Sequence, residues 1–294
     1  KTFVPFIRQE IGLEYVNFFS SAVCVVALII AVLFYHPDQG NTERKSFGEL
    51  FKSLGKILIN GRLMALTIII AGFWTVQQQL YATMPKYVIR MVGEDAKPEW
   101  IANVNPLTVV ICVIFVTQWM KKRNALTSMT IGMFIMPLSA FAMSLGPWFQ
   151  NGFGDSILGM HPFTFMLVVG ICLQGLAECF ISPRFLEFFS LQAPKGEEGV
   201  YLGFSHLHSF FSAIFGFFIS GFLLEKYCPA RETLVGLSDA QIAERYAHAH
   251  YIWYYFVAIA AVAGVALVIY GLICKKLDQR KKSQSEDDAS EEDE

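Results

Sequence analysis

The sequence predicts an all-α membrane protein with seven transmembrane helices. Of its 294 residues, 54% are hydrophobic and only 16% are charged, whereas a soluble domain carries about 25% charged residues. Seven apolar segments reach or approach the length that a membrane-spanning helix needs. They must be helical because lipid offers no partner to unpaired backbone groups. The composition also excludes a disordered chain, a nucleic-acid-binding protein with a basic face and a disulfide scaffold.

The predicted spans follow one another along the whole chain. A transmembrane β-barrel would instead show alternating segments of about 10 residues, a pattern that this sequence lacks. The seven predicted spans are residues 13–35, 63–88, 101–120, 126–146, 162–181, 200–224 and 251–274.

The spans divide the chain into five parts. Residues 1–12 are a predicted external segment, and the first span follows at 13–35. Residues 36–62 form a linker, and residues 63–274 form a bundle of six helices. The tail, 275–294, is acidic, since its last nine residues hold seven acids. We expect its part 283–294 to be a disordered, solvated end.

The linker contains an amphipathic stretch. Apolar residues recur there at helical spacing, with charged residues on the opposite face. Such a helix lies flat on a membrane surface, so we expect it at the cytoplasmic interface. Its apolar residues are Phe47, Leu50, Phe51, Leu54, Ile57 and Leu58.

Loop charges predict the orientation in the membrane. The linker, the loops 121–125 and 182–199 and the tail together carry 15 of the 23 Lys and Arg residues. Cytoplasmic loops are enriched in Lys and Arg. We therefore expect a plasma or inner membrane protein whose segment 1–12 lies outside and whose linker and tail are cytoplasmic.

Glu178 is the strongest candidate for a functional residue. It is the only acid in the interior of a predicted span, and ionisable groups inside a membrane are costly and usually functional. Gln174, Glu178 and Ser182 are spaced four residues apart and so share one helix face. We expect this face to border a cavity, where Glu178 can take up a proton or bind a substrate ammonium group. A structural hydrogen bond between helices is the alternative.

The second span carries a polar and aromatic stripe. Trp74, Gln77, Gln78 and Tyr81 share one face of a continuous helix, and Gln79 lies beside them. Long amides next to aromatic rings can bind a polar ligand, or they can join neighbouring helices by hydrogen bonds. The residues alone leave both interpretations open.

Two further spans carry weaker signals. In the third, Asn105 precedes Pro106, and a proline inside a helix frees a backbone carbonyl. In the sixth, His206 and His208 are two residues apart and so face different directions. A proton-carrying role is possible for a histidine, but we favour a packing role.

Several classes of function have no support in the sequence. There is no Walker loop, dinucleotide fingerprint, HExxH or GxSxG motif. His248 and His250 lack nearby Asp, Glu or Cys partners for a metal. We therefore expect no enzymatic activity, no cofactor and no metal site.

The segment around Glu178 resembles a known family. Glu178 is followed by Ser182–Pro183, then by Ala193-Pro194-Lys195, then by Gly203. This order and spacing are similar to the tenth helix and following loop of the proton-dependent oligopeptide transporter family, within the major facilitator superfamily. Matches to its eighth and seventh helices are Asn105–Pro106 and Phe73, Trp74 and Gln79.

The resemblance implies that the seven spans are helices 6–12 of a major-facilitator fold. It implies a secondary active transporter that takes up di- or tripeptides, or related small solutes, with protons. In that reading Glu178 binds the amino end of the substrate and takes part in proton coupling. The other implied site residues are Asn105, Gln79, Gln78, Tyr81, Trp74 and Gln174 for substrate binding, and Ser182, Pro183 and Pro106 for gating.

The sequence also departs from the family pattern. Gln78 stands where many members carry an acid, and Arg184 follows the Ser-Pro pair where small or apolar residues are usual. The alternatives are therefore a major-facilitator transporter of a sugar, drug or metabolite, and a receptor or scaffold that does not transport. A chain that begins outside the membrane without a signal peptide is unusual, so we expect an N-terminal transporter half as a partner. The other expected partners are the substrate, protons and lipid, and we expect no binding of nucleic acid.

Overall fold

The computed structural model is almost entirely helical. It describes residues 14–34, 47–93 and 96–291, so the predicted external segment 1–12 lies outside the described residues. Within these residues, the only extended pairing is one bridge between Ile157 and Met160. Seven helical segments of the described chain are long and apolar enough to cross a membrane. This confirms the prediction of an all-α membrane protein.

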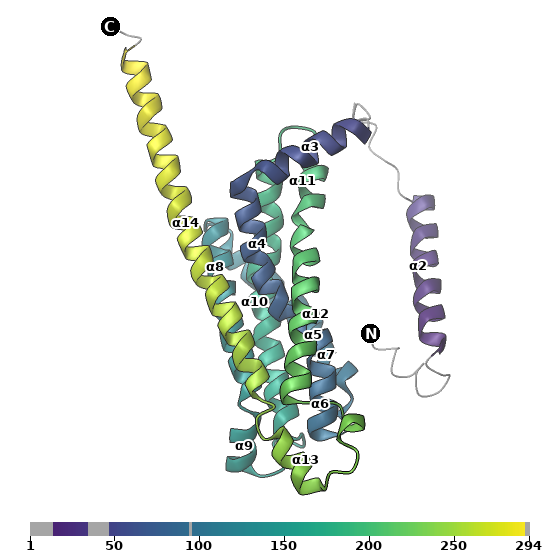
Figure 1. Ribbon diagram of the computed structural model, residues 1–294. Coiled ribbons are helices and arrows are strands. Elements are labelled where there is room, and N and C mark those ends of the chain that lie inside the picture. Colours follow the sequence, from purple (N-terminus) through teal and green to yellow (C-terminus); the bar gives the residue numbers. More distant parts are fainter. Residues whose placement is uncertain (1–13, 35–46, 94–95, 292–294) are drawn as a thin grey trace.

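Six of these spans form one bundle, in which each helix packs against the next (Figure 1). The long α10 (Pro162–Gln192) lies between two neighbours and also contacts α6 (Met84–Val92). In spatial order the row is α7 (Pro98–Met120), α10 (Pro162–Gln192), α8 (Ala125–Ser144), α14 (Tyr251–Glu291), α4 (Gly61–Gln77) and α12 (Leu207–Tyr227).

Helices α8 and α10 approach closely because small residues lie between them. A Cβ at Gly132 would lie only 2.7 Å from the carbonyl oxygen of Ala177. Two hydroxyl groups of α8 donate across the contact, from Ser128 Oγ to the Phe180 oxygen and from Ser139 Oγ to the Gly170 oxygen, both at 2.8 Å. Small residues and interhelical hydrogen bonds are what hold helices together in lipid.

The second predicted span, 63–88, is broken rather than continuous. It consists of α4, a single turn α5 (Gln79–Ala82) and α6. Pro85 at the start of α6 has no N–H to donate. Near the other end of this interruption, the side chain of Gln79 donates from Nε2 to the Thr75 oxygen at 2.7 Å and to the Gly216 oxygen of α12 at 3.3 Å.

Two other elements differ from the sequence-based boundaries. The sixth predicted span, 200–224, is divided at His206 into α11 (Glu198–Ser205) and α12. The tail begins as helix rather than as a disordered end, because α14 continues to Glu291. Arg62, at the start of α4, holds this extension through two hydrogen bonds of 2.9 Å to Asp278.

Two helices precede the bundle. The first span, α2 (Glu14–Phe34), stands apart from it, and the described side chains of α2 are exposed (Figure 1). The second, α3 (Phe47–Ile59), is the predicted amphipathic helix: it buries Ile57 and exposes Lys52 and Lys56. Its Ser53 hydroxyl donates to Glu197 at 3.2 Å, beside the start of α11.

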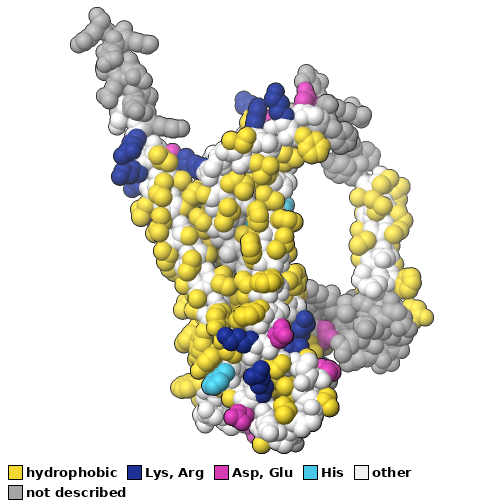
Figure 2. Space-filling model, in the orientation of Figure 1, with side chains coloured by type: hydrophobic (Ala, Val, Ile, Leu, Met, Phe, Trp, Pro, Cys, Tyr) yellow, Lys and Arg dark blue, Asp and Glu magenta, His cyan; other side chains and the backbone are white. Residues whose placement is uncertain are grey.

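Charge is concentrated at the two ends of the molecule. Figure 2 shows an apolar surface along the helices, with Lys and Arg gathered near α3 and the end of α14. At the opposite end, basic and acidic side chains are mixed. We call these the α3 end and the α13 end, after the short helix α13 (Asp239–Tyr246). The α13 end also carries α9 (Gly146–Phe153).

Candidate functional site

Glu178 lies halfway along α10 and is partly buried. The side chain of Gln77, the last residue of α4, donates from Nε2 to Glu178 Oε2 at 2.9 Å. Gln77 is itself only 4% exposed. A hydrogen bond to a charged oxygen of this kind is stronger than one between neutral groups, so the pair joins two helices that are 101 residues apart in sequence.

Gln174 lies one turn before Glu178 on the same face of α10. It is almost fully buried, and its Nε2 donates to the backbone oxygen of Val76 at 3.1 Å. Val76 precedes the break at the end of α4, where carbonyl groups lose their helical partners. Gln174 and Glu178 therefore both bind the broken end of α4.

Asn105 approaches the same part of α10 from α7. Its backbone oxygen would lie 3.0 Å from a Cβ at Gly175, so the glycine allows the two helices to come close at this level. Asn105 is buried, whereas Pro106 is exposed. Pro106 lies inside α7 and removes the N–H that would bond to Ala102.

Several polar atoms on or facing this part of α10 are buried and have no hydrogen-bond partner among the described residues. Native proteins leave few such atoms, and each requires an explanation. A polar ligand or water between α4, α7 and α10 would satisfy them. We call these residues, together with Glu178, the Glu178 site. The unpartnered atoms are Gln77 Oε1, Gln174 Oε1, Asn105 Nδ2 and Ser182 Oγ.

Trp74 belongs to an adjacent aromatic cluster. Its ring centroid lies 5.2 Å from that of His208, and Phe185 contacts the other side of His208 at 5.2 Å. Trp74 Nε1 is also buried without a partner. His208 is buried and His206 is exposed, which confirms that the two histidines face different directions.

Gln79, Gln78 and Tyr81 are placed differently from Gln77. Gln79 is 1% exposed, and its Oε1 accepts from Thr83 at 2.6 Å. Its amide forms hydrogen bonds at both ends and links α5 to α12. Gln78 is partly buried next to Gly216, and Tyr81 is half exposed.

The predicted gating residues do not interrupt their helices. α10 continues through Ser182 and Pro183 as one helix of 31 residues. Pro183 and Arg184 line a surface groove between α10 and α7. Arg184 donates to Glu187 at 2.6 Å and to the Met120 carbonyl, so its charge is held at the groove edge.

Gln77 is part of the polar stripe expected from the sequence, but it is not among the expected site residues. The helical spacing could have indicated Gln77, because it follows Trp74 by three residues and so lies on the same helix face. The way in which α4 packs against α10 decides which glutamine meets Glu178, and hydropathy does not show that packing. Among the described residues, no group of three or more His, Cys, Asp or Glu side chains could hold a metal ion.

A known protein family matches most of the chain. No curated protein matches the chain. The family model of the POT family matches residues 39–234, which cover the linker, α3 to α12 and the Glu178 site. The chain therefore belongs to the POT family, the proton-dependent oligopeptide transporters.

Proposed function

We propose that this POT-family chain is part of a secondary active transporter that takes up di- or tripeptides, or related small solutes, together with protons. The observation that carries the proposal is the carboxylate of Glu178, which lies inside a span beside four unpartnered polar atoms. A buried carboxylate attracts a cation strongly because little water screens it. The amino-terminal ammonium group of a peptide is such a cation.

The same carboxylate offers a route to proton coupling. When Glu178 is ionised, it attracts the ammonium group of the substrate. When it takes up a proton, that attraction is lost and the substrate is held less tightly. The proton and the ammonium group therefore compete at Glu178, so carrying both inward needs a further proton-binding group, which we propose lies on the N-terminal half. The membrane potential supplies about 2.3 kcal/mol per charge per 100 mV.

The remaining polar atoms have complementary tasks in this proposal. Asn105 Nδ2 can donate to a peptide carbonyl, and Gln77 Oε1 and Gln174 Oε1 can accept from a peptide N–H. Trp74 supplies an aromatic surface beside them. We propose that the N-terminal half implied by the family resemblance supplies the facing wall, as the two halves do in transporters built from repeats.

The test is the exchange Glu178→Gln in the complete transporter. We expect gradient-driven uptake of a dipeptide to be nearly abolished while expression is retained, because losing a desolvated ionic partner costs about 2–5 kcal/mol of binding. Glu187→Gln is the matched control, since Glu187 is an exposed carboxylate on the same helix. It is expected to transport normally.

An acetylated dipeptide separates the peptide proposal from its alternative. It lacks the ammonium group, so we expect it to bind poorly to the unchanged protein and to be insensitive to Glu178→Gln. If the variant loses free and acetylated peptide equally, Glu178 does not bind the amino end. If the variant transports normally, Glu178 is a structural contact and a different solute becomes the better assignment.

A further inference from the structure

A second cavity, unrelated to the Glu178 site, opens at the α13 end. Its volume is about 440 Å³, within the range of about 300–1,000 Å³ typical of small-molecule sites. It lies between the end of α6, the start of α10, α9 and α13, with the short 3₁₀ helix η3 (Arg231–Leu234) at its edge. It shares no lining residue with the Glu178 site.

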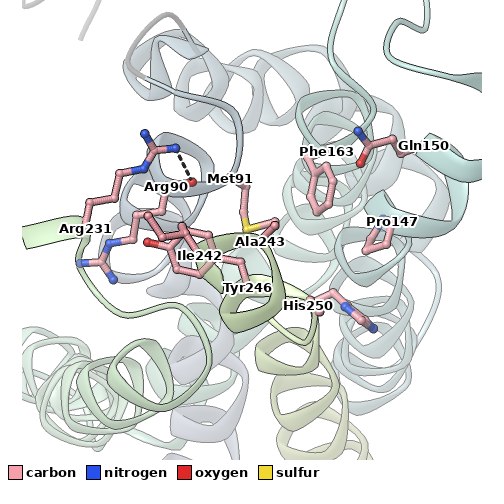
Figure 3. A pocket seen from close by; sticks show the side chains of 11 residues that line it. Arg90, Met91, Pro147, Gln150, Phe163, Arg231, Ile242, Ala243, Tyr246 and His250 are labelled. Carbon is pink, nitrogen blue, oxygen red and sulfur yellow. Dashed lines mark hydrogen bonds between the residues drawn. The ribbon is translucent and has the colours of Figure 1, made fainter. Parts of the chain in front are cut away.

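Two arginine side chains lie together on one side of this cavity (Figure 3). Arg231 donates to the backbone oxygen of Arg90 at 3.4 Å, and Arg90 donates to the backbone oxygen of Cys228. Both partners are neutral, and no ion pair joins either arginine to a described carboxylate. Among the described residues that line the cavity, none is an Asp or Glu. Each guanidinium has five N–H donors, most of which these two contacts leave available.

The rest of the lining consists of an apolar part next to the arginines and a polar part on the side of the cavity away from them. Met91, Phe163 and Ile242 line the space between its two sides. Gln150 and His250 lie on the side away from the arginines (Figure 3). The Nδ1 atom of His250 is buried, and no side chain among the described residues forms a hydrogen bond with it, so a polar ligand could serve as its partner.

We propose that this cavity binds the oxyanion group, carboxylate or phosphate, of a small ligand with an apolar part. Guanidinium groups match the planar, bidentate geometry of such oxyanions. Arg90 and Arg231 bind the charged end, and Met91, Phe163 and Ile242 contact the apolar part. The ligand is either a soluble carboxylate or the headgroup of an anionic lipid, since both present the same chemistry. The inference does not depend on what the Glu178 site transports.

The test compares benzoate with benzamide, its neutral counterpart of the same shape. Binding to the full chain in phosphatidylcholine nanodiscs is measured by titration calorimetry. We expect benzoate to bind at least about tenfold more tightly than benzamide, and Arg231→Gln to remove most of that difference. Arg231 is exposed, so this variant is expected to fold. Arg90→Gln gives a second measurement at the partly buried arginine.

Arg245→Gln is the matched control. Arg245 is an exposed arginine on α13 that lines the neighbouring cavity instead, so benzoate binding is expected to be unchanged. Phosphatidylglycerol nanodiscs distinguish a lipid headgroup from a soluble carboxylate as the ligand. If the unchanged chain binds benzoate more weakly in these nanodiscs than in phosphatidylcholine nanodiscs, and Arg231→Gln shows no such difference, a lipid phosphate occupies the cavity. Unweakened binding identifies a soluble carboxylate. Equal affinity for benzoate and benzamide, or equal losses in Arg231→Gln and Arg245→Gln, would overturn the proposal.

Discussion

Glu178 is a residue whose burial in a membrane span costs free energy and whose hydrogen bond selects one particular partner. A carboxylate taken out of water loses several kcal/mol unless hydrogen bonds replace its hydration. The Nε2 group of Gln77 provides one such bond at 2.9 Å. Consecutive residues on a helix point about 100° apart, so of the adjacent Gln77, Gln78 and Gln79 only one can occupy this position. Gln77 occupies this position and donates to Glu178, whereas Gln79 donates to the backbone of α12.

This geometry predicts different outcomes for two adjacent glutamines. Gln77→Leu keeps the approximate size of the side chain but removes the donor to Glu178. A hydrogen bond to a charged group contributes about 1.5–3 kcal/mol, so we expect the affinity of the complete transporter for a dipeptide to fall about tenfold or more. Gln78→Leu, next to it, removes no hydrogen bond to Glu178 and is expected to change affinity little. Competition binding against a labelled peptide measures both.

The reverse order of effects would contradict this assignment. If Gln78→Leu weakened binding while Gln77→Leu did not, the sequence-based choice of Gln78 would be the better one. Equal expression and equal melting temperature of the two variants are the control, because they separate a binding defect from misfolding.

At the scale of helices, hydropathy predicted the spans but not their interruptions. The spans follow from composition because any segment of about 20 apolar residues is stable only as a helix in lipid. The break at Gln78 is stabilised by distant partners. The bonds that stabilise the first break, from Gln79 to Gly216 and between Thr83 and Ser220, each join residues 137 positions apart. A local sequence pattern carries no information about such pairs.

The contact between α8 and α10 gives a prediction at the same scale. In Gly132→Ala the new methyl group would lie 2.7 Å from the backbone oxygen of Ala177, which cannot move without shifting α10. Overpacking of this kind costs about 1–3 kcal/mol, so we expect a lower melting temperature in detergent and weaker dipeptide binding, since Ala177 directly precedes Glu178. Thermal unfolding of the purified protein measures the first effect.

Gly271→Ala is the matched control for that experiment. Gly271 lies within α14, and a Cβ there would meet no atom within 4 Å. Because alanine favours a helix by about 1 kcal/mol over glycine, the variant is expected to be as stable as the original or slightly more stable. Equal destabilisation by both substitutions would mean that the close approach at Gly132 is not what limits this contact.

At the scale of the whole molecule, the distribution of charge supports one orientation. The α3 end carries the loop Lys121, Lys122 and Arg123 and the basic start of the α14 extension. By contrast, the loop between α9 and α10 contains no Lys or Arg. The helical extension keeps the basic residues close to the bundle, since Arg62 binds Asp278 within it. Anionic lipid on the cytoplasmic side attracts such a surface.

Cysteine labelling tests this orientation at two exposed positions, Lys122 at the α3 end and Ser156 in the loop after α9. Both are changed to cysteine, one at a time, in a chain whose six natural cysteines are replaced by alanine. Because Lys and Arg are retained on the cytoplasmic side, a membrane-impermeant maleimide applied to intact cells is expected to label Ser156→Cys and not Lys122→Cys. Labelling of both after the cells are opened is the control for reactivity. The opposite pattern in intact cells would place the α3 end outside, and the linker and the α14 extension would then face away from the cytoplasm.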